Sequence, residues 1–105
     1  MRTKFVPGTT ASLSVTATTG AMEIPAPAGG LASTLRRQVR LYNEGANPCF
    51  VVFGVTGVTA VAGAGVGIAP GQAEIFTVLP GQTHLAAICR ATLTTTLVVT
   101  GGEGD

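Results

Sequence analysis

The side chains that could do chemistry are few in this chain, and they are scattered along it. His84 is the only histidine, and a zinc site would need it together with Cys49 and Cys89, yet neither cysteine lies near another ligand at zinc-binding spacing. The carboxylates of the chain are Glu23, Glu44, Glu74, Glu103 and Asp105. No two of them lie at a spacing typical of general acid–base catalysis. We therefore expect no catalytic residue, no cofactor and no metal site, and a protein that is not an enzyme.

The cysteines and the glycine-rich stretch are expected to be structural. Cys49 and Cys89 both lie in apolar, strand-like sequence, which predicts two buried thiols, with a single cross-strand disulfide as the alternative. The glycine run at residues 63–67 lacks the Lys-Ser/Thr pair that meets phosphate and Mg²⁺ in a phosphate-binding loop. Because glycine in strand-rich sequence marks bulges and bends, this run is expected to form a hairpin tip.

Arg36, Arg37 and Arg40 form the one basic cluster of the sequence. On a strand, Arg36 and Arg40 share a face. Two interpretations remain open: the arginines protect an exposed or edge strand from stray pairing, or they bind an acidic partner. Tyr42 is the only aromatic residue near them, so stacking on nucleic-acid bases is poorly supported. The net charge of +1 indicates no attraction to nucleic acid or to an acidic membrane.

The composition indicates a surface that is partly covered by other protein. Charged residues make up 10% of the 105 residues and hydrophobic residues 46%, whereas a typical globular chain carries about 25% charged residues. The length suits a single domain. We expect a sizeable protein–protein contact, as in a homo-oligomer; a monomer coated with Thr and Gly is the alternative. The N-terminal sequence has no apolar segment typical of a signal peptide.

Short stretches of alternating polar and apolar residues, separated by Gly, Pro and Asn, run through most of the chain. They predict an all-β domain, an antiparallel β-sandwich or jelly roll of about eight short strands. Met22 and Ile24 are expected to point inward. The predicted organisation is an N-terminal arm (1–10), a β-sandwich domain (11–100) with a surface loop at 26–33, and a C-terminal tail (101–105). Strands are expected at residues 11–17, 21–25, 34–42, 49–53, 55–61, 65–69, 73–79, 83–89 and 93–100.

The segment 39–53, VRLYNEGANPCFVVF, is predicted to be a β-hairpin that turns at residues 43–48. The nearly continuous apolar run 49–53 is typical of a strand covered on both faces, and a neighbouring subunit is the expected cover. The uncharged stretch 49–69 is long enough to cross a bilayer, but its Gly, Val and Thr residues favour strands over a membrane helix. The buried positions of the hairpin are expected to be Val39, Leu41, Phe50 and Val52.

Two Pro-Gly-Gln triplets, at residues 70–72 and 80–82, predict type II turns. Proline presets φ at the second turn position, and glycine accepts the positive φ of the third. The sequence between them alternates, so Ile75 and Thr77 are expected on one face of a strand, opposite Glu74, Phe76 and Val78.

Three segments, VRLYNEGANPCFVVFG, IAPGQAEIFTVLPGQTHLAAI and TLVVTGGEG, resemble small proteins encoded in the head modules of tailed bacteriophages. These are capsid decoration, or cement, proteins of β-sandwich or jelly-roll fold, and the resemblance spans residues 39–104. It implies a virion structural protein that is made in the host cytoplasm and binds the outer surface of the major capsid protein as a dimer or trimer. Its role would be to stabilise the shell by bridging capsomers.

The candidate contact residues come from the arm and from the basic cluster. The arm is expected to grip a neighbouring molecule, and neither nucleic acid nor membrane is expected as a partner. The alternatives to decoration are another phage structural component (a head fibre base, a head–tail connector or a tail protein) and a ligand-binding β-module. The candidate contacts are Arg2, Lys4, Phe5, Arg36, Arg40 and Tyr42.

Overall fold

The computed structural model describes residues 5–25 and 36–104. Within them the chain forms eight β-strands and no helix. The described residues therefore contain no helix that could cross a membrane. The uncharged stretch 49–69 instead contains two of the strands and their connection. The strands are β1 (Val6–Val15), β2 (Gly20–Glu23), β3 (Arg36–Asn43), β4 (Cys49–Gly54), β5 (Val66–Ile68), β6 (Ala73–Thr77), β7 (His84–Ile88) and β8 (Thr95–Gly104).

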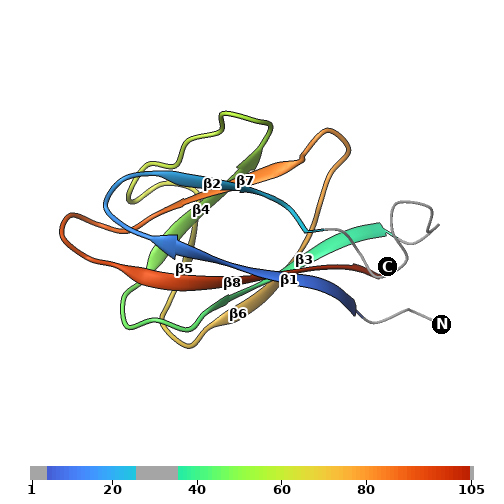
Figure 1. Ribbon diagram of the computed structural model, residues 1–105, viewed down its shortest axis with the longest axis horizontal. Coiled ribbons are helices and arrows are strands. Elements are labelled where there is room, and N and C mark those ends of the chain that lie inside the picture. The colour runs from blue at the N-terminus through green and yellow to red at the C-terminus, as the bar shows by residue number, and fades with distance from the viewer. Residues whose placement is uncertain (1–4, 26–35, 105) are drawn as a thin grey trace.

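The strands form two four-stranded antiparallel sheets that pack face to face (Figure 1). Sheet A has the order β1-β8-β3-β6 and sheet B the order β2-β7-β4-β5. The chain passes from one sheet to the other at every connection except β4–β5, which is the topology of a jelly roll. The predicted eight-stranded sandwich is thus confirmed. We call one end of it, formed by the connections 16–19, 44–48, 69–72 and 89–94, the short-loop end.

The core lies between the sheets and consists of the inward-facing residues of each strand. On β3, for example, the buried Val39 and Leu41 alternate with partly exposed polar side chains. As expected, Met22 and Ile24 also pack into this core. Each fully buried Val, Leu or Ile contributes about 1.5–3 kcal/mol relative to an exposed one. The core cluster further includes Val15, Cys49, Val51, Ile68, Leu85, Ala87, Cys89, Leu97 and Val99.

The predicted hairpin at 39–53 is wrong in two respects. First, β3 belongs to sheet A and β4 to sheet B, so the two strands do not pair. Second, Cys49 and Val51 face the core, while Phe50 and Val52 lie on the outer face and are only partly buried. Because β4 is apolar on both faces, its residue pattern cannot show which face points inward.

The outer face of β4 is partly covered by the chain itself. The β4–β5 connection, where a strand was expected at 55–61, instead contains two tight turns, in which Val58 N–H donates to Val55 O and Ala64 N–H to Val61 O. It lies over sheet B (Figure 1) and is fastened by Ala60 N–H, which donates to Thr19 Oγ1 at 2.8 Å. Phe50 and Val52 stay partly exposed beneath it, and a neighbouring subunit as the further cover stays a prediction.

The two Pro-Gly turns are confirmed. Gly71 and Gly81 have φ of 78° and 91°, and the N–H of the following glutamine donates back to Ala69 O and Leu79 O, both at 3.0 Å. Each glutamine side chain adds a bond that the sequence pattern did not predict, because its Oε1 accepts from the N–H of the first turn residue at 2.8 and 2.9 Å. Both ends of β6 are therefore closed by the same turn, and its two faces are as predicted.

One polar side chain, Asn43, is completely buried at the short-loop end. Its Nδ2 donates to Asn47 O at 2.8 Å and to Ile68 O at 2.9 Å. Its Oδ1 accepts from Gly45 N–H at 3.1 Å and from the Thr95 hydroxyl at 2.6 Å. The sequence pattern placed Asn43 in a turn; it is instead the last residue of β3, and its side chain connects β3 with β5 and β8.

The first and last strands of the chain extend into the segments expected as arm and tail. β1 begins at Val6, which is the register partner of Glu103, and β8 ends at Gly104, the partner of Arg36. Backbone hydrogen bonds form a sheet without help from side chains, so the glycines of β8 do not end the strand. Residues 1–4 of the arm and the predicted loop at 26–33 lie outside the described part of the chain.

Candidate interaction surface

Three of the predicted contact residues meet on the outer face of sheet A. Since Val39 and Leu41 of β3 face the core, the alternate residues Arg36, Arg40 and Tyr42 face away from it. β3 lies between β8 and β6, so it is not an edge strand. The arginines therefore do not guard a sheet edge. They lie on an outward-facing part of the sheet, and their contact with an acidic partner stays a prediction.

Arg40 and Tyr42 form the centre of this surface. The guanidinium carbon of Arg40 lies 5.6 Å from the centroid of the Tyr42 ring, within the range of a cation–π contact. Across the sheet, Arg40 is the register partner of Ile75 on β6 and of Thr100 on β8. Ile75 is 49% exposed, which makes it an uncovered apolar residue beside the arginine. The surface thus combines positive charge, an aromatic ring and an exposed aliphatic side chain.

Hydroxyl groups occupy the side of the surface nearest β1. Thr10 and Thr100 are register partners, and their Oγ1 atoms lie 3.0 Å apart in a hydrogen bond. The neighbouring Ser12 and Ser14 of β1 are exposed. This side can donate and accept hydrogen bonds without adding charge.

The carboxylates of the described chain lie elsewhere. Glu74 and Glu103 are on the inward-facing positions of β6 and β8, Glu23 is on the exposed face of β2 in sheet B, and Glu44 is in the β3–β4 connection. Arg36 and Arg40 are therefore not balanced by a carboxylate of the described residues on their own face. A surface of this kind fits a partner that presents acidic side chains.

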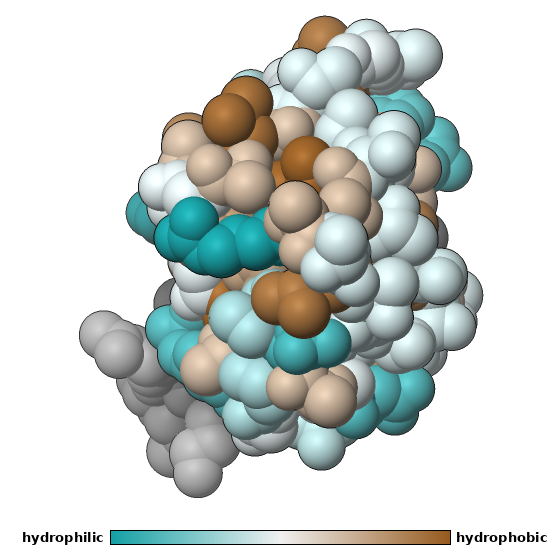
Figure 2. Space-filling model, turned by 90° about the vertical axis from the view of Figure 1, so that its left-hand side faces the viewer, coloured by the Kyte–Doolittle hydropathy of each residue, from teal (hydrophilic) through white to brown (hydrophobic). Residues whose placement is uncertain are grey.

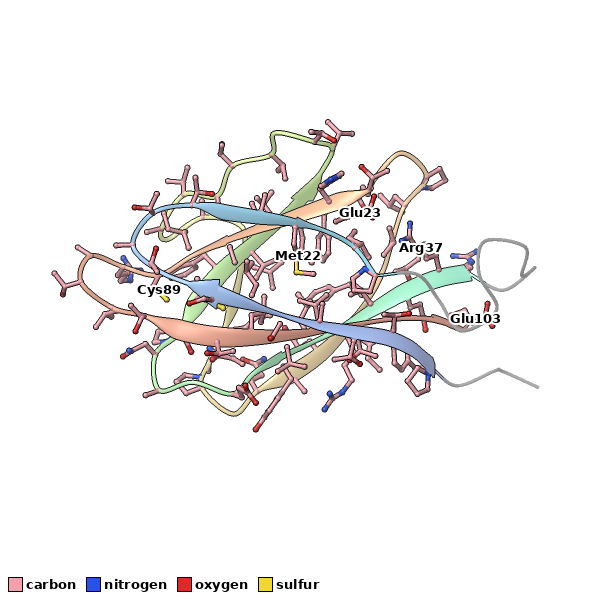
Figure 3. All side chains as sticks on the ribbon, viewed as in Figure 1. Met22, Glu23, Arg37, Cys89 and Glu103 are labelled. Atoms are coloured by element: carbon pink, nitrogen blue, oxygen red, sulfur yellow. The ribbon has the colours of Figure 1, made fainter. Side chains whose placement is uncertain are left out.

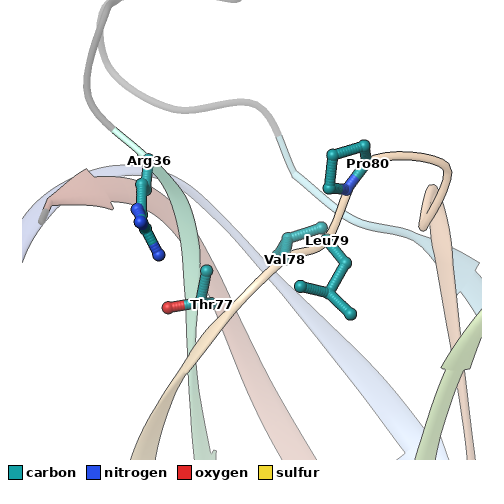
Figure 4. Close-up of a pocket in the computed structure, with 5 residues that line it drawn as sticks. All are labelled: Arg36, Thr77, Val78, Leu79 and Pro80. Carbon is teal, nitrogen blue, oxygen red and sulfur yellow. The ribbon is translucent and has the colours of Figure 1, made fainter.

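A hollow of about 300 Å³ lies at the Arg36 end of the surface (Figure 4). Its walls are mostly apolar, and Leu79 in particular is 58% exposed. Arg36 adds a guanidinium, so the hollow suits an apolar side chain with a carboxylate close by. The described residues that line it are Arg36, Thr77, Val78, Leu79 and Pro80.

The other predicted contacts are not part of this group. Arg2 and Lys4 lie outside the described residues. Phe5 precedes β1 and is partly buried, and β8 separates β1 from β3. Ile75 was not among the predicted residues, because its position beside Arg40 depends on the pairing of β3 with β6, which no local pattern shows.

Arg37, the third residue of the basic cluster, is withdrawn from the surface. It faces inward at the end opposite the short-loop end (Figure 3), where its Nη2 donates to Ile24 O at 2.9 Å and links the two sheets. Its register partner on β8 is Glu103, an opposite charge across the strand pair. Arg37 Nε and Glu103 Oε2 are buried and have no hydrogen-bond partner among the described residues. Arg37 is therefore a structural residue of the sandwich.

The groups with catalytic or metal-binding chemistry are not gathered into a site in the described part of the chain. His84 lies at the start of β7, with its Nδ1 2.8 Å from Thr83 Oγ1. Among the described residues no three His, Cys, Asp or Glu side chains come together as metal ligands would.

Figure 2 shows the short-loop end, where weakly polar surface surrounds separate hydrophobic and hydrophilic groups.

Comparison with known proteins adds little to this picture. No protein-family model matches the sequence, and no curated protein is similar to it. One similar solved structure comes from work on Bacillus endospore appendages, described as a novel family of disulfide-linked pili. That match has 19% sequence identity and a TM-score of 0.48, and it covers 94% of this chain and 87% of the other. We draw no functional conclusion from a likeness of this size.

Proposed function

We propose that this protein is a non-catalytic structural protein that docks through the outer face of sheet A onto an acidic protein surface. In the more specific form of the proposal, it is a phage decoration protein and the acidic surface is the outer side of the major capsid protein. The observation that carries the proposal is the uncovered sheet face on which Arg36, Arg40, Tyr42 and Ile75 lie together. The resemblance of residues 39–104 to decoration proteins supplies the class of partner.

The mechanism would be docking without reaction. Arg36 and Arg40 would form charge-assisted hydrogen bonds with partner carboxylates, while Tyr42 and Ile75 lose their contact with water. A homo-oligomer would hold several capsomers at once. Because it binds only the assembled shell, it would shift the equilibrium towards that shell by mass action.

The test compares how well two variants bind to capsid shells. Each variant reverses the charge of one arginine, so both change the net charge by the same amount. Arg40→Glu changes the proposed surface. Arg90→Glu is the matched control, because Arg90 is an exposed arginine that lies over Phe50 of sheet B, far from the surface. Each variant would be co-expressed with the major capsid protein of the same genome, and the protein that sediments with shells would be measured. We expect Arg40→Glu to reduce binding at least about tenfold and Arg90→Glu to leave it unchanged.

Two results would count against the proposal. Equal binding of Arg40→Glu and wild type would show that the outer face of sheet A is not the contact. Cryo-electron microscopy of native particles would test the decoration role itself, since decoration requires many copies across the shell exterior. A ring of a few copies at one vertex would assign the protein to a connector or to the tail.

A further inference from the structure

Two thiols face each other in the core at the short-loop end. Phe50 and Ile88 are register partners in the β4–β7 pair, so the next residues along the ladder, Cys49 and Cys89, lie directly opposite each other. Both are free cysteines whose side chains point into the core, at 0% and 1% exposure. Figure 3 shows the sulfur of Cys89 near this end of the sandwich.

The hydrogen-bond pattern shows what kind of pair this is. Cys89 N–H donates to Thr16 O at 2.8 Å, on the side of β7 that faces away from β4. Cys49 and Cys89 therefore form a non-hydrogen-bonded pair of an antiparallel ladder, for which the Cα atoms are about 4.5 Å apart. Disulfides span Cα separations of about 4.4–6.8 Å. The backbone is thus already placed for a bond between the two sulfur atoms.

Among the described residues, no other strong interaction occupies the sulfur atoms. Cys49 Sγ lies 3.9 Å from Asn43 Nδ2, and Cys89 Sγ lies 3.8 Å from Val15 O. Both are weak contacts that a change of side-chain torsion can give up. Asn43 keeps its bonds to oxygen acceptors in either case.

We propose that Cys49 and Cys89 are a disulfide site, filled when the chain meets a disulfide oxidant before its core has closed. The oxidant is a small-molecule disulfide such as oxidised glutathione. The thiolate of one cysteine attacks a sulfur of the oxidant and releases one molecule of thiol, which leaves a mixed disulfide. The second cysteine then attacks the protein sulfur and releases the second thiol. Two electrons pass from the cysteines to the oxidant, and their two protons go to the released thiolates and solvent.

The timing follows from the surroundings of the two thiols. Burial, and to a lesser degree the proximity of Cys89, raises the pKa of Cys49 from 9.0 to about 11, and burial also raises the pKa of Cys89. Only the thiolate reacts, so the folded, reduced protein is slow to oxidise. An unfolded or opened chain exposes both thiols and can form the bond.

The experiment compares two samples of the full chain treated with oxidised glutathione. One sample is folded and reduced, and the other is refolded from denaturant in the presence of the oxidant. We expect each chain of the refolded sample to be free of disulfides to other chains, lighter by two hydrogen atoms and without thiols that react in denaturant. Cleavage after glutamate separates residues 45–74 from 75–103, so these two peptides should stay joined until a reductant is added. The folded sample should oxidise at least about tenfold more slowly.

The bond should also change stability measurably. A link between residues 49 and 89 closes a long loop, for which a rise in Tm of roughly 10 °C over the reduced protein is expected. Cys89→Ala should show no such rise, and it should instead take up one glutathione on refolding. Two free thiols, glutathione on both cysteines or a bond between two chains in the refolded wild type would overturn the proposal. Equal oxidation rates in the two samples would overturn its timing.

Discussion

Replacing Asn43 with leucine should remove much of the stability of this domain. The substitution keeps a buried side chain of similar size but deletes four hydrogen bonds. Ile68 O and the Thr95 hydroxyl take part in buried bonds, and each costs about 2 kcal/mol when left unpaired. Asn47 O and Gly45 N–H are partly buried, and water can replace their partner at about 0.5–1 kcal/mol each. The expected loss in the free energy of unfolding is about 5 kcal/mol.

A loss of this size is comparable with the whole stability of a typical domain, which is about 5–15 kcal/mol. Urea unfolding followed by far-ultraviolet circular dichroism, in the presence of a reductant, would measure it. Asn47→Leu is the matched control, because the Asn47 side chain makes one exposed bond, to Thr94 O at 2.8 Å. It should cost less than about 1 kcal/mol. If Asn43→Leu cost no more than Asn47→Leu, the buried network would not be what holds the short-loop end together.

Three further perturbations test other parts of the fold. Gly45→Ala would place a Cβ atom 2.8 Å from the Thr95 Cα. The free energy of unfolding, measured in urea, should therefore fall by about 1–3 kcal/mol. An unchanged unfolding midpoint would contradict the packing described at this turn. Thr92 has a φ of 65°, so Thr92→Gly should raise stability by about 1 kcal/mol, and a lower Tm would refute the strain. The pKa of Cys49 is raised from 9.0 to about 11. A thiol of this kind stabilises the fold fully below its unfolded pKa and less as pH rises through its folded pKa. The Tm of the reduced protein should therefore fall as the pH rises from 9.0 to about 11. The fall should be steeper than that of the Cys49→Ala variant over the same pH range.

Residue alternation predicted those strands whose two faces differ. On β6 the partly buried Glu74 and Phe76 and the exposed Ile75 fall on the faces expected from the sequence, because one face is covered and the other is not. On β4 the same reasoning failed. The connection 55–65 covers part of its outer face, and that face is apolar as well. Phe50 and Val51 therefore look alike in the sequence although they point in opposite directions.

For the outer face of sheet A, the sequence predicted only which residues of the single strand β3 lie together. That Arg36, Arg40 and Tyr42 share a face follows from the period of a strand, and the structure agrees. The position of Ile75 beside Arg40 depends on how β6 pairs with β3, and the pairing of β3 with β8 rather than β4 depends on the jelly-roll order. Pairings between distant segments are set by the packing of the whole core, and a local pattern does not contain them.

The pairing of Val6 with Glu103 brings the two ends of the described chain to neighbouring positions on β1 and β8, about 5 Å apart. A short glycine linker could therefore join them, and new termini could be opened in the β4–β5 connection, where Gly57 and Gly63 lie in exposed turns. Such a circular permutant would keep every strand pair of the jelly roll. It would also move the attachment point of a fused cargo to the outer side of sheet B. A cargo attached there would point away from the outer face of sheet A, so that face would stay free beneath the displayed cargo.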